Sequence, residues 1–230
     1  SSSVREEKLM KLILENWREY LKEENGGSYR VYHGSLDATF PEFNITAPDE
    51  KTHDFGFFGD GLYFDTSLTQ AIGYAGGLGD WDLREQNIKI LEDTVAGENT
   101  SNIMESGAVQ IINKNGKETS GVYVLDLLIN NPYYWKGAPI PSIIQNPYIN
   151  TMPADIANGV AEELEYSSWE ELVETIEAST DKSRWEEILA GASSKAIREL
   201  GHDGTIMART GASGSEIIVF DPNQIRNALK

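Results

Sequence analysis

Three residues that can carry chemistry stand at the borders of segments with strand composition. His33 ends Tyr29-Arg30-Val31-Tyr32-His33, Tyr63 lies in Leu62-Tyr63-Phe64, and Glu216 opens Glu216-Ile217-Ile218-Val219-Phe220. An imidazole, a phenol and a carboxylate can hydrogen bond to a substrate and respond to its charge. Each also has an ordinary structural interpretation, as a strand-end histidine, a core tyrosine or an edge charge. The joint pattern, more than any one residue, indicates an active site.

Other familiar sites are absent from the sequence. The chain has no Cys, and its three His, at positions 33, 53 and 202, lack metal-ligand spacing. This composition excludes thiol nucleophiles, iron–sulfur clusters and zinc fingers, and we expect no metal. No Gly-x-x-x-x-Gly-Lys-Ser/Thr loop occurs, and no Gly-x-Gly-x-x-Gly joins a strand to a helix.

The charge balance restricts the partners. The 230 residues include 19 Lys and Arg against 37 Asp and Glu, a formal net charge of −18. This charge argues against broad nonspecific binding to nucleic acid, which needs clustered basic residues. It favours solubility, and it also suits a basic protein partner or mimicry of nucleic acid. No apolar stretch is long enough to span a membrane, and the first residues contain no apolar signal-peptide core. Because the chain does not begin with Met, we expect a domain excised or processed from a longer protein.

The first half of the chain contains the elements that must position His33 and Tyr63. Helical periodicity predicts an N-terminal helix within residues 1–25, followed by the His33 strand. After the Tyr63 strand, Thr66 is a candidate N-cap for a short helix that extends to Tyr74. The Gly-, Asn- and Asp-rich composition of 76–108 predicts a loop insertion, and a hairpin with strands near 109–112 and 121–129 follows.

The second half combines helices with the strand of Glu216. We expect a helical insertion over 153–200, with helices near 154–177 and 184–200. Its run of glutamates is typical of a solvated helix face. Strands near 204–208 and 216–220 end the chain. Helices between short strands, without a βαβ rhythm, predict a single α+β domain over 1–230.

Four stretches of the chain resemble motifs of one enzyme family. They are similar to ADP-ribosyltransferases of the His-Tyr-Glu class, the diphtheria-toxin and poly(ADP-ribose) polymerase branch, and most of all to the transferase domains of phage and mobile-element polyvalent proteins. The stretches are Tyr32-His33-Gly34-Ser35; Phe58-Gly59-Asp60-Gly61-Leu62-Tyr63-Phe64, with Tyr74 eleven residues after Tyr63; Leu200-Gly201-His202-Asp203-Gly204; and Gly214-Ser215-Glu216-Ile217-Ile218-Val219-Phe220.

The resemblance implies a split, mainly antiparallel sheet with flanking helices, and NAD as the substrate in a cleft. Glu216 would stabilise the oxocarbenium-like ribose as nicotinamide leaves. His33 would contact ribose hydroxyls or a phosphate. The backbone of Gly34, beside Ser35, would pair with the nicotinamide carboxamide, while Tyr63 and Tyr74 would hold the cationic ring between them.

The resemblance also implies a function with open alternatives. The expected activity is transfer of ADP-ribose from NAD to a macromolecule, with protein the favoured acceptor, by a toxin or phage effector in the bacterial cytoplasm or a host cell. An NAD glycohydrolase and a noncatalytic acidic module that mimics nucleic acid are the alternatives. Ala71 and Leu36 replace a Ser and an Arg of the polymerase branch, which removes contacts to nicotinamide. Arginine-modifying relatives carry a Glu where this chain has Gly214, so we expect an acceptor other than arginine.

Overall fold

The computed structural model describes residues 27–39, 61–77, 79, 81–116, 118–148, 151–208 and 214–229. The expected N-terminal helix, the loop that precedes residue 61 and most of the Gly-rich segment 211–215 lie outside these ranges. Among the described residues, no helix is both long and apolar enough to cross a membrane.

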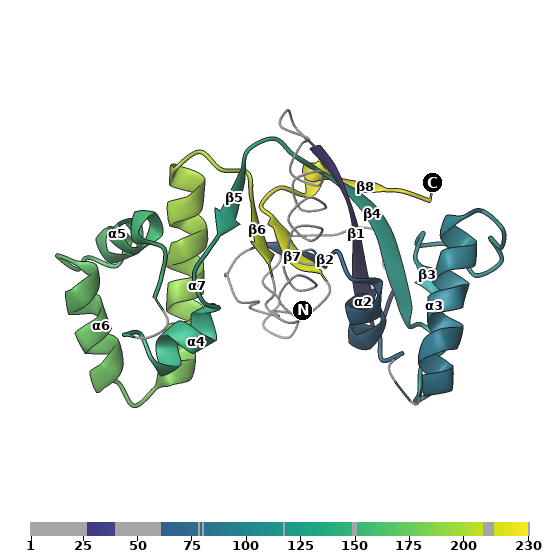
Figure 1. Cartoon of the computed structure of the whole chain (residues 1–230), viewed down its shortest axis with the longest axis horizontal. Coiled ribbons are helices and arrows are strands. Elements are labelled where there is room, and N and C mark those ends of the chain that lie inside the picture. The colour runs from purple at the N-terminus through teal and green to yellow at the C-terminus, as the bar shows by residue number, and fades with distance from the viewer. Residues whose placement is uncertain are drawn as a thin grey trace, which may run out of the picture.

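Eight strands of the described chain form one sheet, with helices at both of its ends (Figure 1). The elements in chain order are β1 (Gly27–Ser35), β2 (Leu62–Asp65), α2 (Leu68–Tyr74), α3 (Trp81–Val95), β3 (Val109–Gln110), β4 (Gly121–Ile129), β5 (Pro132–Trp135), α4 (Ile140–Gln145), α5 (Ala154–Glu163), α6 (Trp169–Ala178), α7 (Lys182–Glu199), β6 (Gly204–Ala208), β7 (Ser215–Val219), the 3₁₀ turn η1 (Pro222–Gln224) and β8 (Ile225–Asn227). The strand order is β3-β4-β1-β2-β7-β6-β5, and β8 pairs with β4.

The sheet is split between β1 and β2. These two strands share a single register pair, Tyr32 with Asp65, whereas β1 pairs with β4 along its whole length. The two halves share a buried hydrophobic cluster to which β1 and β4 contribute Val31 and Leu125, and β2 and β7 contribute Phe64 and Ile217. Every pairing except β5 with β6 is antiparallel. The expected α+β class, with a split and mainly antiparallel sheet, is therefore confirmed.

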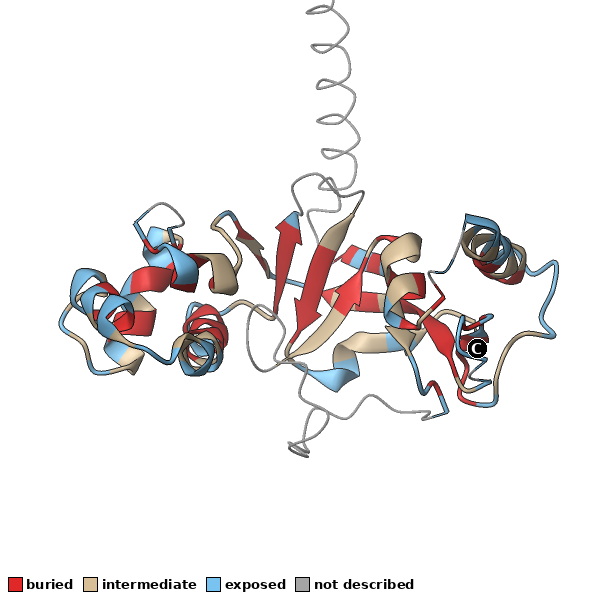
Figure 2. Ribbon diagram, turned by 90° about the horizontal axis from the view of Figure 1, so that it is seen from below, coloured by how far each residue is buried: buried red, intermediate tan, exposed pale blue. Residues whose placement is uncertain are grey.

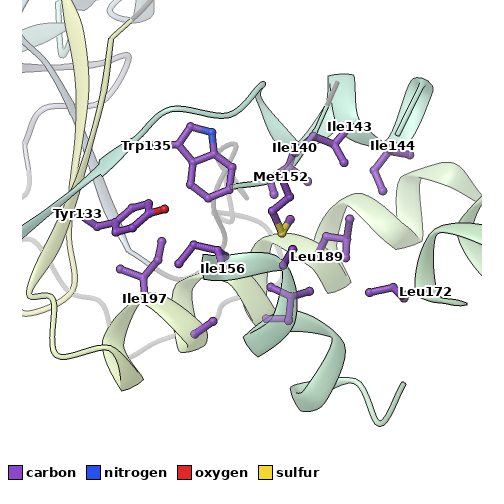
Figure 3. Close-up of a cluster of buried hydrophobic side chains, with 14 of the residues drawn as sticks. Tyr133, Trp135, Ile140, Ile143, Ile144, Met152, Ile156, Leu172, Leu189 and Ile197 are labelled. Atoms are coloured by element: carbon purple, nitrogen blue, oxygen red, sulfur yellow. The ribbon is translucent and has the colours of Figure 1, made fainter. Parts of the chain in front are cut away.

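Helices α4, α5, α6 and α7 form a lobe at the β5 end of the sheet, and we call them the helical lobe (Figures 1 and 2). The helical lobe is the connection between the parallel strands β5 and β6. Its core includes Ile143, Ile156 and Leu189, which are buried together with aromatic rings of β5 (Figure 3). Full burial of one such side chain stabilises the fold by about 1.5–3 kcal/mol.

The helix expected over residues 154–177 is instead two helices, α5 and α6. Glu165 interrupts them with a φ of 63°, a conformation that ends a helix. Ser168 then begins α6, because its side chain accepts a hydrogen bond from the Glu171 backbone N–H at 3.3 Å. The expectation of one continuous helix was wrong, because glutamates occur on both sides of Ser168 and the N-cap between them was not recognised.

The interval 76–108, expected to be a loop insertion, contains the 15-residue helix α3. The helix was not predicted, because two of its buried residues, Asn87 and Thr94, are polar and weaken the apolar pattern. The Asn87 side chain donates hydrogen bonds to the carbonyls of Gly77 and Ile112 and accepts one from the Ile112 N–H. This buried amide therefore fastens α3 to the chain on both sides of it.

The turn Gly201-His202-Asp203-Gly204 has a structural function. The two carboxylate oxygens of Asp203 accept hydrogen bonds from the backbone N–H groups of Asn130 and Asn131, both at 2.8 Å. A side chain on Gly204 would lie 2.7 Å from the carbonyl oxygen of Ile218, so the close approach of β6 to β7 requires glycine there. The motif thus fixes the β4–β5 turn against the start of β6.

Candidate active site

Glu216 lies in the middle of the sheet, directly opposite a second acidic residue. The register of β2 with β7 pairs Asp65 with Glu216, and both residues are buried, with 4% and 6% of their surfaces exposed. Directly opposed residues of an antiparallel pair point to the same face, with Cβ atoms about 4.5–5.5 Å apart. The row continues through the partners Tyr32 on one side and Met207 on the other. Two carboxylates therefore lie side by side at the centre of one sheet face.

Tyr63 lies on the same face as Glu216, one row away. It pairs with Ile218 of β7, and side chains two residues apart on a strand share a face. Its ring is partly buried and packs against the core of the helical lobe. The structure thus brings Tyr63 and Glu216 to one face, next to the helical lobe.

Gly34 lies against the backbone of α2. A Cβ added at Gly34 would lie 1.8 Å from the carbonyl oxygen of Ala71 and 3.0 Å from the backbone nitrogen of Ala75. Glycine is therefore needed here for packing against α2, independently of any contact that its backbone makes with a ligand. The same helix ends at Tyr74, whose side chain is 53% exposed.

His33 is turned toward the opposite face from Glu216. It pairs with Tyr123 of β4, and its ring lies edge-on to Phe64 at 5.7 Å between centroids. Phe64 and Tyr123 both belong to the buried cluster shared by the two sheet halves. The Nδ1–H of His33 donates a hydrogen bond to the carbonyl of Tyr63 at 2.9 Å. His33 therefore bridges the split between β1 and β2.

The hydroxyl of Ser35 is used in a local turn. It donates a hydrogen bond to the carbonyl of Asp37 at 2.7 Å and accepts one from the Asp37 N–H at 3.1 Å. Ser35 thus shapes the exit of the chain from β1.

Thr66 links β2 to β7 and does not cap α2. Its side-chain oxygen accepts a hydrogen bond from the Ser215 N–H at 2.7 Å, and its own N–H donates to the Ser215 carbonyl at 3.0 Å. Ser67 occupies the N-cap position without a side-chain cap bond. The expectation that Thr66 caps the helix was wrong, because the cross-strand partner Ser215 uses its hydroxyl.

Asp65 is the site residue that the sequence interpretation missed. One oxygen, Oδ1, accepts a hydrogen bond from the Ser67 N–H at 2.5 Å. A Cβ on Gly214 would lie 3.0 Å from that same oxygen, and Gly214 has a φ of 141°, which L side chains rarely adopt. Asp65 therefore holds the start of α2 and packs against the residue two positions before Glu216. Asp65 stands two residues after Tyr63, and in a strand this spacing places both side chains on the same face. This spacing was the signal available in the sequence.

Tyr133, on the same sheet face, has a strongly raised pKa. Burial raises the pKa of Tyr133 far above its usual value, and the hydrogen bond to Asp155 raises it further. The hydroxyl therefore stays protonated and donates to the Asp155 carboxylate at 2.9 Å. This pair holds β5 to the first turn of α5.

No three His, Cys, Asp or Glu side chains of the described residues are grouped so that they could hold a metal ion.

The family comparison agrees with this fold. The family model described as ADP-Ribosyltransferase in polyvalent proteins matches residues 23–230. The chain belongs to this family, and the resemblance that the four stretches indicated is confirmed. Membership supports ADP-ribosyltransferase activity in general. Searches among curated proteins and among solved structures gave no match.

Proposed function

We propose that this protein cleaves NAD and transfers its ADP-ribose to a macromolecular acceptor, with release of nicotinamide. The observation that carries the proposal is the buried Glu216 at the start of β7, on the same sheet face as Tyr63, in a chain of the ADP-ribosyltransferase family. NAD cleavage develops positive charge on the ribose, and a carboxylate fixed beside it stabilises that charge.

The other residues have supporting functions in this proposal. Tyr63 and Tyr74 supply aromatic faces to the cationic nicotinamide ring, and Gly34 supplies backbone hydrogen bonds to its carboxamide. For His33 the geometry favours a positioning function. Its Nδ1–H bond to the Tyr63 carbonyl holds β2 to β1, and its ring packs against Phe64 and Tyr123.

The acceptor that we propose is a protein. The net charge of −18 opposes a broad phosphate-binding surface and favours a basic protein surface. We further propose that the domain acts as a phage or toxin effector in bacterial cytoplasm or a host cell, as the resemblance to polyvalent-protein transferases implies.

The test is release of nicotinamide from NAD by the purified chain and its Glu216→Gln variant. We expect the variant to keep its melting temperature and to lose about 10²- to 10³-fold in turnover, because a charge-stabilising group is removed from the reacting centre. Glu85→Gln, which neutralises an exposed carboxylate on α3, is the matched control and should be unchanged.

The outcomes separate the alternatives. Free ADP-ribose as the product, even with candidate proteins present, would indicate a glycohydrolase. No release of nicotinamide by the folded chain would indicate a noncatalytic module. Turnover of Glu216→Gln within a few-fold of the unmodified chain would remove Glu216 from the mechanism.

A further inference from the structure

We infer that Asp65 is a second catalytic carboxylate of this site, the base that takes the proton from the attacking nucleophile. The inference rests on the proposed function, because it assigns the step that follows cleavage of NAD. Glu216 and Asp65 are directly opposed across β7 and β2, share one face and are buried to a similar extent. If substrate reaches Glu216, the neighbouring carboxylate is within reach of the same ribose carbon.

Asp65 also fills the space beside the residue that precedes Glu216 by two. A side chain at position 214 would begin 3.0 Å from Asp65 Oδ1 and 2.9 Å from the Ser67 Cβ. The lack of a side chain at Gly214 therefore does not leave Glu216 without an acidic neighbour, because the adjacent strand supplies one. On this inference a guanidinium also has a carboxylate that can take its proton, so arginine is among the acceptors that the site could use, contrary to our expectation from Gly214.

The chemistry of glycosyl transfer gives the two carboxylates different tasks. One stabilises the positive charge on the sugar, while the other removes a proton from the incoming nucleophile. Asp65 Oδ1 accepts a hydrogen bond from the Ser67 N–H. That bond fixes the position of the group.

The step balances without any further reagent. The bond between the ribose C1′ and the nicotinamide nitrogen breaks, and nicotinamide leaves as a neutral molecule with the electron pair. The oxygen or nitrogen of the nucleophile forms a bond to C1′, and its proton moves to the Asp65 carboxylate. The acceptor is thus a group that must lose a proton when it attacks, such as a hydroxyl, an amine, a guanidinium or water.

The experiment compares two nucleophiles in the Asp65→Asn variant. Asparagine keeps an amide oxygen for the Ser67 N–H and nearly the same volume, but it cannot take a proton. We expect release of nicotinamide in water to fall about 10²-fold, which is a typical contribution of a general base. Sodium azide is an anionic nucleophile that has no proton to lose, so it should restore release and yield ADP-ribosyl azide.

The controls separate catalysis from support of the fold. Asp126→Asn neutralises an aspartate of β4 that is paired with Arg30, and it should leave release of nicotinamide unchanged. Glu216→Gln should not respond to azide, because its defect lies in stabilising the cation. If Asp65→Asn does not fold, the unmodified chain provides the readout. Its hydrolysis of NAD should be slower in D₂O than in H₂O, while its reaction with azide should not.

Three results would overturn the inference. One is release by Asp65→Asn within about threefold of the unmodified chain, a small change beside the 10²-fold effect expected of a base. Another is a loss of release that azide does not restore, which would assign Asp65 a purely structural function. The last is the absence of any solvent isotope effect on hydrolysis by the unmodified chain. If the unmodified chain releases no nicotinamide at all, the proposed function fails first and the inference fails with it.

Discussion

The two tyrosines assigned to the nicotinamide ring differ in how much of the fold depends on them. Tyr74 is 53% exposed at the end of α2, whereas Tyr63 packs against the core of the helical lobe. A binding function is therefore easier to separate from a structural one at Tyr74. Substitution of Tyr63 would change both NAD binding and the stability of the fold.

We predict that Tyr74→Ala weakens NAD binding roughly 2- to 30-fold, which corresponds to about 0.5–2 kcal/mol of cation–π attraction. The melting temperature should change little, because Tyr74 is 53% exposed and lies at the end of α2. Titration calorimetry with NAD and a thermal melt measure the two effects. The matched control is Tyr148→Ala, which removes another exposed tyrosine, on the helical lobe. A fall in melting temperature with unchanged NAD affinity would mean that Tyr74 belongs to the fold and not to the site.

More of the candidate site than of the structure around it could be predicted from the sequence. That His33, Tyr63 and Glu216 lie in strands could be predicted from composition, but the expectation that His33 ends its strand was wrong, because β1 continues to pair with β4 through Ser35. The position of Asp65 opposite Glu216 could not be predicted, because pairing of β2 with β7 is nonlocal and register is set by the whole sheet. That His33 faces the opposite side could not be predicted either, because its pairing with Tyr123 is also nonlocal.

At the scale of elements, the contact of β1 with α2 depends on the absence of a side chain at Gly34. We predict that Gly34→Ala destabilises the protein by about 1–3 kcal/mol or more, because the added methyl would overlap the Ala71 carbonyl. NAD binding should weaken too, since α2 carries Tyr74. Denaturant unfolding measures the free energy.

Gly191→Ala is the matched control for this substitution. Position 191 lies inside α7 with no atom within 4 Å of an added Cβ, so alanine there should stabilise the helix by up to about 1 kcal/mol. Equal stability of Gly34→Ala and the unmodified chain would show that α2 can shift away from β1 at no cost.

The start of α6 gives the protein a pH-dependent contact. The Ser167 hydroxyl and N–H both donate to the Glu171 carboxylate, and these bonds lower the pKa of Glu171 from its ordinary 4.5. A carboxylate with a lowered pKa in the folded state stabilises the fold above its unfolded pKa, and the contribution is lost as pH falls through the folded value.

We therefore predict that Glu171→Gln is less stable than the unmodified chain at pH 7, and that the difference shrinks as pH falls below 4.5. Unfolding free energies measured between pH 7 and pH 3 test this. Glu170→Gln, in the same first turn, is the matched control, and its difference should change less with pH. A difference for Glu171→Gln that is constant over this range would mean that the carboxylate charge contributes nothing.

At the scale of the whole molecule, the net charge of −18 acts against compactness. Carboxylates repel one another across the surface, and salt screens this repulsion beyond about 8–10 Å at physiological ionic strength. We predict that the melting temperature at pH 7.5 rises when sodium chloride is raised from low concentration to several hundred millimolar. An equal rise near the isoelectric point of about 4.5, where the net charge is small, would show that a general salt effect is responsible.

The pairing of β2 with β7 sets when the molecule can first act. The two carboxylates that face each other are about 150 positions apart in the chain, and such distant pairings form late because of the entropy of closing so long a loop. At translation rates of about 5–20 residues per second, roughly 8 to 30 seconds pass between synthesis of Asp65 and of Glu216. During this time the edge of β2 that β7 will cover has no strand to pair with. A cell that makes this protein is therefore exposed to its proposed chemistry only when synthesis of the domain is nearly complete.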